Sequence, residues 1–244
     1  MLNISEQPNK FRPRASEVFR PEVIGITFDS DSNVLLSLID RSIRFPHLRQ
    51  IFEAQQGLEH KTHGRFCLPG EVHCLLKDGR RMTLRTLKPL DKKPFFDFHA
   101  ALSDETVNNR YFTPVPISKR ISLDQVIDSC TFDRQKEIVI VATIPDSSPE
   151  GYKIIGEGRL IHLNKTNDAD VSFIVSDDFQ RRGTGTALFE VLESIARQGN
   201  IRCIVGTTLP SNSAMDGLFR KQGFNVTYDL TENILKAEKN LLFL

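Results

Sequence analysis

The 244-residue sequence predicts an α+β fold in which helices cover a central, mainly antiparallel and partly mixed β-sheet. Three segments rich in β-branched residues follow one another between residues 137 and 175, and only short turn-rich loops separate them. Such short loops favour an antiparallel meander. Residues 184–198 then form one long amphipathic segment that ends before Gly199, and its apolar stripe predicts a helix packed on the sheet.

The N-terminal third is predicted in two parts. Residues 22–28 have the composition of a strand, residues 29–33 that of a polar turn, and residues 34–52 that of an apolar helical stretch interrupted at Pro46. We therefore expect residues 1–70 to form a small N-terminal appendage of unknown role, and residues 71–244 to form the main domain. The apolar surface of residues 34–52 is too large for a free tail, so it is expected to pack on the main domain or in a homodimer interface.

The main domain opens with a predicted hairpin, because two apolar segments flank Asp78-Gly79, a dipeptide that tolerates a tight turn. Three short helices are expected next. They cover residues 93–102, residues 104–112 capped by Ser103, and residues 122–130, where Ser122 and Gln125 have the spacing of a capping box.

After the long helix, the sequence predicts a strand at residues 201–209 and a short helix at residues 213–222. Two closing strands are expected at residues 224–230 and 240–244.

Bulk properties exclude several classes of partner. The formal net charge is +1, and no run of residues approaches the roughly 20 apolar positions that a membrane helix needs. Neither nucleic acid nor a membrane is therefore expected as a partner. The cysteines form no regular framework, which suits a reducing compartment, and we expect a cytoplasmic protein; they are Cys67, Cys74, Cys130 and Cys203.

The most informative segment is QRRGTG, residues 180–185, at the start of the long helix. The first N–H groups of a helix have no partner within the helix, and the helix dipole adds partial positive charge there. Gly183 and Gly185 remove the Cβ atoms that would keep an anion away from these groups, and Arg181 and Arg182 add charge. The segment therefore predicts a phosphate site, although a glycine turn with solvated arginines would have the same composition.

Two other phosphate loops do not fit this segment. A dinucleotide fingerprint needs a third glycine and an acidic residue at the end of the next strand, and neither is present. The Gly-Lys-Ser/Thr of a nucleoside-triphosphate loop is also absent.

These residues resemble a known family. QRRGTG is similar to the Q/R-x-x-G-x-G/A motif of the GNAT superfamily of acyl-CoA-dependent N-acyltransferases, and residues 212–224, NSAMDGLFRKQGF, are similar to the family's later asparagine loop, short helix and Gly-Phe ending. Residues 76–112 are similar to the opening of the acetyltransferase domain in Pat-type bacterial protein lysine acetyltransferases.

The resemblance implies acetyl-CoA as co-substrate, with the CoA pyrophosphate on the backbone amides of residues 181–186. It implies that residues 174–176 pair with the pantetheine amides, that Asn212 lies near pantetheine, and that Arg220 or Lys221 lies near the adenosine phosphates. The implied binding residues are Ile174, Val175, Ser176, Arg181, Arg182, Gly183, Thr184, Gly185, Thr186, Asn212 and Arg220.

Acyl transfer to an amine needs an uncharged nucleophile, and a lysine at its reference pKa of about 10.4 requires a base. Two carboxylates are candidates. Pat-type enzymes have a catalytic glutamate at the position that matches Asp170, whereas Glu157 lies on the preceding strand. Either side chain could instead pair with a neighbour such as Arg159. Many family members carry a tyrosine, as proton donor for the leaving thiolate, where this sequence has Phe219.

The resemblance therefore implies an enzyme that transfers acetyl to a primary amine of a protein lysine, by direct attack in a ternary complex. A small-molecule amine is the alternative acceptor, and a catalytically weak acyl-CoA-binding regulatory module is the alternative function. No metal is expected. His60, His63, Cys67, His73 and Cys74 lie close in sequence, but their spacing fits no regular zinc site, and two adjacent strand residues point to opposite faces.

Overall fold

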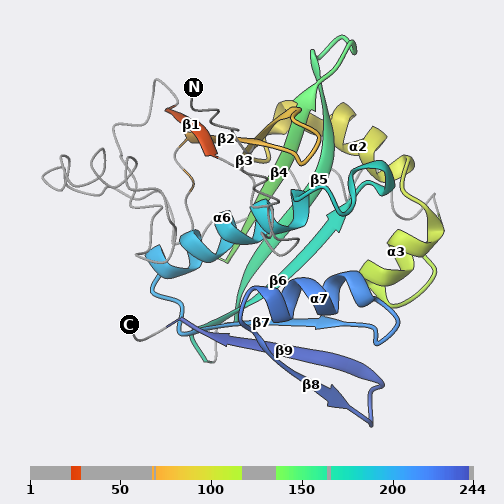
Figure 1. The fold of residues 1–244 in the computed structure, drawn as a ribbon, viewed down its shortest axis with the longest axis vertical. Coiled ribbons are helices and arrows are strands. Elements are labelled where there is room, and N and C mark those ends of the chain that lie inside the picture. The colour runs from red at the N-terminus through yellow and green to blue at the C-terminus, as the bar shows by residue number, and fades with distance from the viewer. Residues whose placement is uncertain (1–22, 29–67, 69, 117–135, 164–165, 242–244) are drawn as a thin grey trace, which may run out of the picture.

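A computed structural model describes residues 23–28, 68, 70–116, 136–163 and 166–241 (Figure 1). The predicted turn at residues 29–33, the helical stretch at residues 34–52 and the Ser122–Gln125 capping box lie outside these ranges. The described helical elements are η1 (Pro89–Asp91), α2 (Lys92–Ala100), α3 (Asp104–Tyr111), η2 (Asp177–Phe179), α6 (Thr184–Gln198) and α7 (Ser213–Lys221).

The strands form one mixed sheet in the order β1-β2-β3-β4-β5-β6-β7-β9-β8. All neighbours are antiparallel except β6 and β7, which run parallel, so the predicted fold class is confirmed. The strands are β1 (Val23–Phe28), β2 (Gly70–Leu75), β3 (Arg81–Thr86), β4 (Glu137–Pro145), β5 (Tyr152–Leu163), β6 (Asp168–Val175), β7 (Cys203–Thr208), β8 (Asn225–Asp229) and β9 (Ile234–Asn240).

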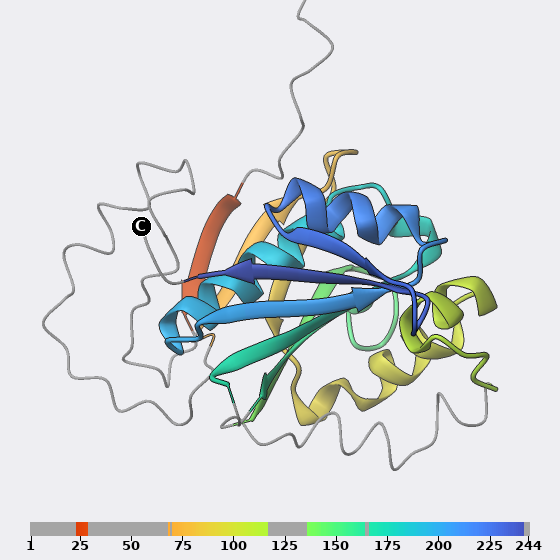
Figure 2. The ribbon, with the colours of Figure 1, turned by 90° about the horizontal axis from the view of Figure 1, so that it is seen from below.

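Helices cover both faces of the sheet, with α6 and α7 on one side and α2 and α3 on the other (Figure 2). The central strands are accordingly apolar on both faces. In β4, Ile138 and Ile140 belong to the core under α6, whereas Val139 and Val141 belong to the core under α2 and α3. This two-sided burial explains why residues 137–144 are a nearly continuous apolar run rather than an alternating one.

Two glycines of β5 let α6 lie close to the sheet. A Cβ atom on Gly156 would lie 3.1 Å from the Thr184 methyl group, and one on Gly158 would lie 2.9 Å from a Leu192 methyl group. The stripe that predicted α6 is buried against this surface, with Leu188 and Ile195 both 0% exposed. Gly199 ends the helix as predicted, and its N–H donates to the Ile195 carbonyl at 2.9 Å.

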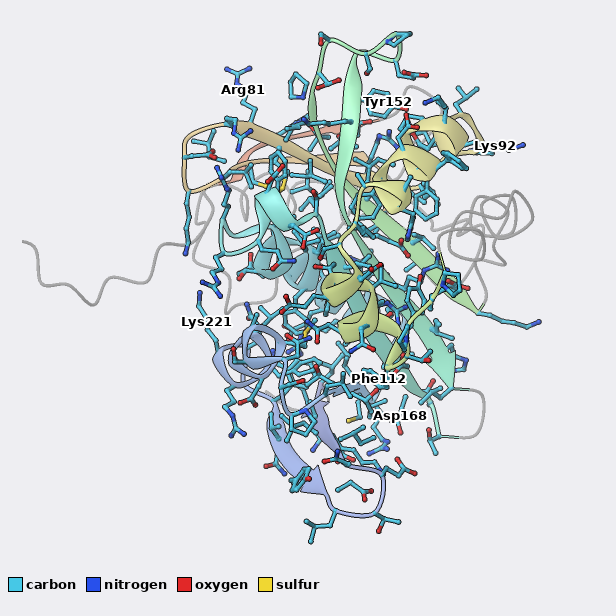
Figure 3. The ribbon with its side chains drawn as sticks, turned by 90° about the vertical axis from the view of Figure 1, so that its right-hand side faces the viewer. Arg81, Lys92, Phe112, Tyr152, Asp168 and Lys221 are labelled. Atoms are coloured by element: carbon cyan, nitrogen blue, oxygen red, sulfur yellow. The ribbon has the colours of Figure 1, made fainter. Side chains whose placement is uncertain are left out.

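On the other face, a buried ion pair fixes the start of α2. Asp91 accepts two hydrogen bonds of 2.7 Å from Arg85 and one of 2.6 Å from the Tyr152 hydroxyl. Figure 3 shows Tyr152 beside this end of α2. Ser103 caps α3 as predicted, since its Oγ accepts from the Thr106 N–H at 3.2 Å.

The hairpin around Asp78-Gly79 is confirmed as β2 and β3, and Gly79 has a φ of 82°. The meander of β4, β5 and β6 is also confirmed. The strand within the predicted appendage is β1, which pairs antiparallel with β2 at the edge of the sheet.

The last strand that the structure describes is β9, which ends at Asn240 and was not predicted. Of the strand predicted at residues 240–244, Leu241 lies outside β9, and residues 242–244 are not among the described residues. Residues 234–240 mix charged and apolar side chains, and they form a strand because they pair with β7 on one side and β8 on the other. A prediction based on runs of apolar residues does not detect such a strand.

Candidate functional site

The sheet has a fork between β6 and β7. The two strands pair only at Ala169 with Ile204 and at Asp170 with Val205. Beyond this point β6 keeps its pairing with β5, while β7 pairs with β9. Among the described strands, none pairs with the backbone groups of β6 that face the gap beyond Asp170. Such an open strand edge can bind an extended, amide-containing ligand.

The end of β6 leads directly into the loop that starts α6. Gly183 is the N-cap with a φ of 98°, and Arg181 has a φ of 58°. A non-glycine residue in this left-handed region costs roughly 1–2 kcal/mol, and such conformations gather at functional sites. The Thr184 hydroxyl fixes the turn by donating to the Phe179 carbonyl at 3.2 Å.

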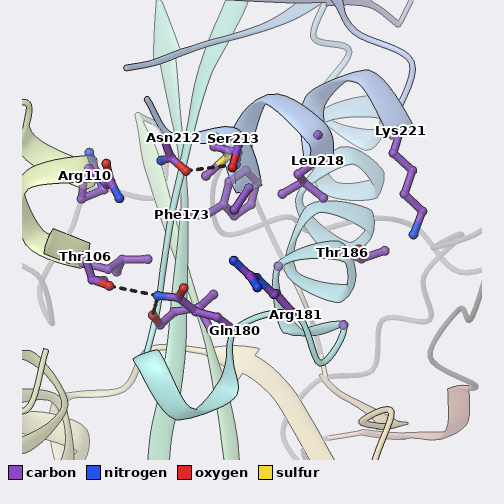
Figure 4. Close-up of a pocket in the computed structure, with 18 of the residues that line it drawn as sticks. Thr106, Arg110, Phe173, Gln180, Arg181, Thr186, Asn212, Ser213, Leu218 and Lys221 are labelled. Atoms are coloured by element: carbon purple, nitrogen blue, oxygen red, sulfur yellow. Dashed lines mark hydrogen bonds between the residues drawn. The ribbon is translucent and has the colours of Figure 1, made fainter. Parts of the chain in front are cut away.

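A pocket of about 490 Å³ lies between the fork, this loop, α3 and α7 (Figure 4). Its wall combines apolar side chains with the glycines of the loop. Seven of the eleven implied binding residues line it, namely Ile174, Val175, Arg181, Gly183, Gly185, Thr186 and Asn212. The Asn212 Oδ1 caps α7 by accepting from the Met215 N–H at 3.1 Å.

The other four implied binding residues are not among those that line the pocket. Ser176 donates its N–H to the Ile155 carbonyl at 2.9 Å. Thr184 is only 1% exposed. Arg182 pairs with Asp78, and Arg220 donates to Asp216 at 2.8 Å on its own helix.

Several lining residues were not singled out from the sequence. Lys77 comes from the β2–β3 turn, and Thr106 and Arg110 come from α3. Gln180, the first residue of the loop motif, donates to the Thr106 hydroxyl at 2.9 Å and to the Val175 carbonyl at 3.2 Å, so it ties α3 to the end of β6. Lys221, named above as the alternative to Arg220, also lines the pocket.

The β2–β3 turn is attached to the loop. The Lys77 N–H donates to the Arg182 carbonyl at 3.1 Å, and the Arg182 side chain donates to Asp78. Hydrogen bonds from Arg80 and from Arg182 lower the pKa of Asp78 below its ordinary value. The turn therefore supports the back of the loop, and Lys77 adds positive charge to the wall of the pocket.

Asp170 lies at the vertex of the fork, where it is the last residue of β6 that pairs with β7. It is half-buried and does not itself line the pocket. Burial raises the pKa of its carboxyl group to about 6, against the opposing charge of Arg110. A carboxylate with such a pKa is a competent proton acceptor near neutral pH.

Glu157 has a different environment. It is 3% exposed, pairs in register with Ile174, and accepts a hydrogen bond of 2.9 Å from His99 and an ion-paired one from Arg159. Burial alone would raise its pKa, but the charge of Arg159 and the bond from His99 outweigh this, so the pKa lies well below its ordinary value. Arg159 also binds Glu137 at 2.8 Å, which extends the chain of polar side chains from the buried Glu157 to these two half-buried residues.

Phe219 fills the α7 side of the fork. It is 1% exposed, and a Cβ atom on Gly206 of β7 would lie 2.7 Å from its para carbon. The ring therefore abuts the backbone of β7 at the position where a tyrosine would carry its hydroxyl group.

Among the described residues, no group of three or more histidine, cysteine, aspartate or glutamate side chains is placed to hold a metal ion. His73 and Cys74 face opposite ways, since His73 lies 3.0 Å from the Thr83 hydroxyl and Cys74 is buried. His60, His63 and Cys67 lie outside the part of the chain that the structure describes. In the same described part, no helix has the length and apolar character to cross a membrane.

Comparison with known proteins shows which family of domains carries this site. Residues 81–225, more than half of the chain, match the family model of the acetyltransferase (GNAT) domain. The GNAT domain of S. lividans PAT is 26% identical with a TM-score of 0.62, over 70% of this chain and 97% of that one. An acetyltransferase of Pseudomonas aeruginosa is 25% identical over 149 residues, which is 61% of this chain and 77% of that protein. Mycobacterium smegmatis RimJ, solved in complex with CoA-disulfide, shares the fold with a TM-score of 0.56 and 14% identity, over 70% of this chain and 87% of that one.

Proposed function

Since the chain belongs to the GNAT family of acyl-CoA-dependent N-acetyltransferases, we propose that it transfers an acetyl group from acetyl-CoA to the amine of a protein lysine. The pocket at the fork, with its glycine-lined helix start, is the observation that carries the proposal. The similarity to the GNAT domain of S. lividans PAT supports a protein acceptor, because the sequence resemblance points to the same type of enzyme.

Acetyl-CoA fits this pocket in chemical terms. Amides of residues 181–186 at the α6 N-terminus would receive the pyrophosphate, and Arg181, Lys77 and Lys221 would add positive charge around it. The unpaired edge of Ile174 and Val175 would bind the pantetheine amides, and the Nδ2 of Asn212 would donate to them.

Asp170 is proposed as the general base. The amine nitrogen attacks the thioester carbonyl carbon, and its proton passes to Asp170, directly or through one water molecule. The new C–N bond forms, the C–S bond breaks, and CoA leaves as a thiolate that takes a proton from solvent. A free backbone N–H near Val175 would stabilise the oxyanion. Glu157 is assigned a structural role, because its oxygens already accept from His99 and Arg159.

The acceptor is tested by measuring CoA release with acetyl-CoA and three acceptor sets. A lysine-containing protein substrate, a panel of polyamines, and buffer alone separate the alternatives. Turnover with the protein and not with polyamines is expected. Turnover with polyamines alone would contradict a protein acceptor, and saturable acetyl-CoA binding without turnover would point to a regulatory acyl-CoA-binding module.

The base is tested by Asp170→Asn, with Glu157→Gln as the matched removal of a carboxylate charge. Asp170→Asn is expected to lower kcat by about 10²–10⁴-fold while acetyl-CoA affinity stays within about twofold. Glu157→Gln, assayed at a temperature where it is folded, should keep most of kcat. The reverse pattern would assign the base to Glu157.

A further inference from the structure

Arg110 lies between the pocket and the proposed base. It comes from the last turn of α3, and its Nη2 donates to the Ser172 hydroxyl at 2.8 Å. Ser172 and Asp170 are two residues apart in β6, so both side chains point to the face that α3 covers. Figure 4 shows Arg110 at the α3 side of the pocket, at the opposite end from Lys221.

Among the described residues, no carboxylate forms an ion pair with the guanidinium group of Arg110. The group also lies over the ring of Tyr111, 5.3 Å from its centroid. Arg110 is the charge that opposes the effect of burial on Asp170, and it also acts on Glu157. An arginine with a fixed position is therefore placed to act on the carboxylate beside it.

The other charged side chains near Asp170 either form ion pairs of their own or lie on strands further from it. From β5, Arg159 lies diagonal to Asp170, and it is bound to Glu157 and Glu137. The β5 residue opposite Asp170 is Ile161, and the β7 residue beside it is Val205. One strand further, Glu238 of β9 pairs with Val205 and is exposed. Among the residues that the structure describes, Arg110 is the cation that faces Asp170 from the helix packed over it.

We propose that Arg110 is a positioning residue: held by Ser172, its guanidinium group keeps the carboxylate of Asp170 ionised at the fork, ready to accept the proton of the acceptor amine. The inference rests on the proposed role of Asp170 as the general base. It assigns a function to Arg110, an α3 residue that lies 60 positions before Asp170 in the chain.

The role of Arg110 can be measured without any acceptor. A ¹³C NMR titration of the full-length protein reports the ionisation midpoint of Asp170, whose signal is assigned by its loss in Asp170→Asn. The wild-type midpoint is expected near pH 6. In Arg110→Gln it should rise by about one pH unit, which is a tenfold weaker preference for the ionised form. Ser172→Ala should raise it less, and Arg110→Lys should restore most of the wild-type value.

A matched control removes an arginine from the same region. Arg202 binds Asp168, two residues before Asp170, at 2.7 Å, and it does not line the pocket. Arg202→Gln should leave the Asp170 midpoint unchanged. An Asp170 midpoint that is equal in wild type, Arg110→Gln and Arg110→Lys, all shown to be folded by circular dichroism, would overturn the proposal.

The kinetic arm separates this inference from the proposed function. With acetyl-CoA and a polylysine probe, the acid limb of kcat/KM should follow the Asp170 midpoint in each variant. If the ionisation midpoint of Asp170 rises in Arg110→Gln but the acid limb of kcat/KM does not shift, Asp170 is not the base. The positioning role of Arg110 is then overturned as well. If the ionisation midpoint of Asp170 is unchanged in Arg110→Gln and the acid limb of kcat/KM still coincides with it, only the positioning role is overturned. Asp170 then remains the base.

Discussion

Gly183, the N-cap of α6, and Gly185, in the first turn of the same helix, are required for different reasons. Gly183 has a φ of 98°, which disfavours any side chain whatever the space around it. Gly185 has no such backbone constraint, and a Cβ atom there would meet only Leu218 at 3.5 Å, an ordinary contact. The folded protein therefore tolerates a side chain at Gly185, but the pocket that Gly185 lines does not.

We predict that Gly185→Val binds acetyl-CoA at least about tenfold more weakly, a loss of about 1.4 kcal/mol, because the branched side chain occupies the approach of the phosphates. Calorimetry measures the affinity. Gly185→Ala, which adds one methyl group, should lose less, and both variants should melt within a few degrees of wild type. Equal acetyl-CoA affinity in all three proteins would remove the phosphates from this loop.

Phe219 gives the second prediction at this scale. Phe219→Tyr should destabilise this protein, because the para carbon of the ring already packs against the backbone at Gly206 and an added hydroxyl group would have to displace it. Overpacking of this kind costs about 1–3 kcal/mol, measurable by urea unfolding. Phe112→Tyr, at a residue 39% exposed, is the control and should be neutral. A Phe219→Tyr variant of full stability and higher kcat would show that the fork accommodates a proton donor.

Among the elements, the β2–β3 turn has a role that its sequence does not show. Asp78-Gly79 predicts a turn, and the structure has one, but the turn also holds the loop before α6, about one hundred residues later, through Lys77 and Arg182. No local pattern reports a contact between two loops so far apart in the chain. The same reason kept Arg110 and Lys77 out of the site predicted from the sequence, whereas the glycine loop was found because its signal is contiguous.

Loss of this attachment should weaken acetyl-CoA binding. In Asp78→Ala, KM for acetyl-CoA is expected to rise about two- to fivefold with kcat unchanged, the range expected for an exposed ion pair. Asp97→Ala, which breaks the exposed pair of Asp97 with Lys93 on α2, is the control and should leave KM unaltered. A KM for Asp78→Ala equal to that of the control would contradict support of the loop by the turn.

At the scale of the whole molecule, the charged chain of Glu137, Arg159, Glu157 and His99 joins two central strands to α2. The apolar patterns of β4, β5 and α6 are strong, so the sequence predicted the sheet and the helix packed on it. In the sequence, Glu157 and Arg159 appear only as two charged residues of a strand, and a solvent-facing pair would look the same. Their burial depends on α2, which comes from a segment almost 60 residues earlier.

Glu157→Gln is therefore expected to lower the free energy of unfolding by about 1.5–3 kcal/mol at pH 7, because it removes the buried carboxylate charge that accepts from Arg159 and His99, while Arg159 keeps its ion pair with Glu137. The folded-state pKa of Glu157 is depressed, so its stabilising effect is present above the ordinary glutamate pKa of about 4.3 and is lost as the pH falls further. Urea unfolding at several pH values should show a weaker acid dependence in the variant. Asp97→Asn is the exposed control, and a Glu157→Gln variant as stable as this control would contradict the buried role.

In the proposed binding mode, acetyl-CoA lies along the free edge of β6, in the fork between β6 and β7, as a strand of the sheet would. Amide groups of residues 171–175 that face the gap then exchange their hydrogens with solvent quickly in the free protein and slowly once the ligand lies along them. Deuterium uptake followed by mass spectrometry should fall in this segment when CoA is added, while β4, which is paired on both sides, stays equally protected. Uptake in residues 171–175 that is the same with and without CoA would place the ligand away from the edge of β6. In this binding mode the gap between β6 and β7 is filled only while the ligand is bound.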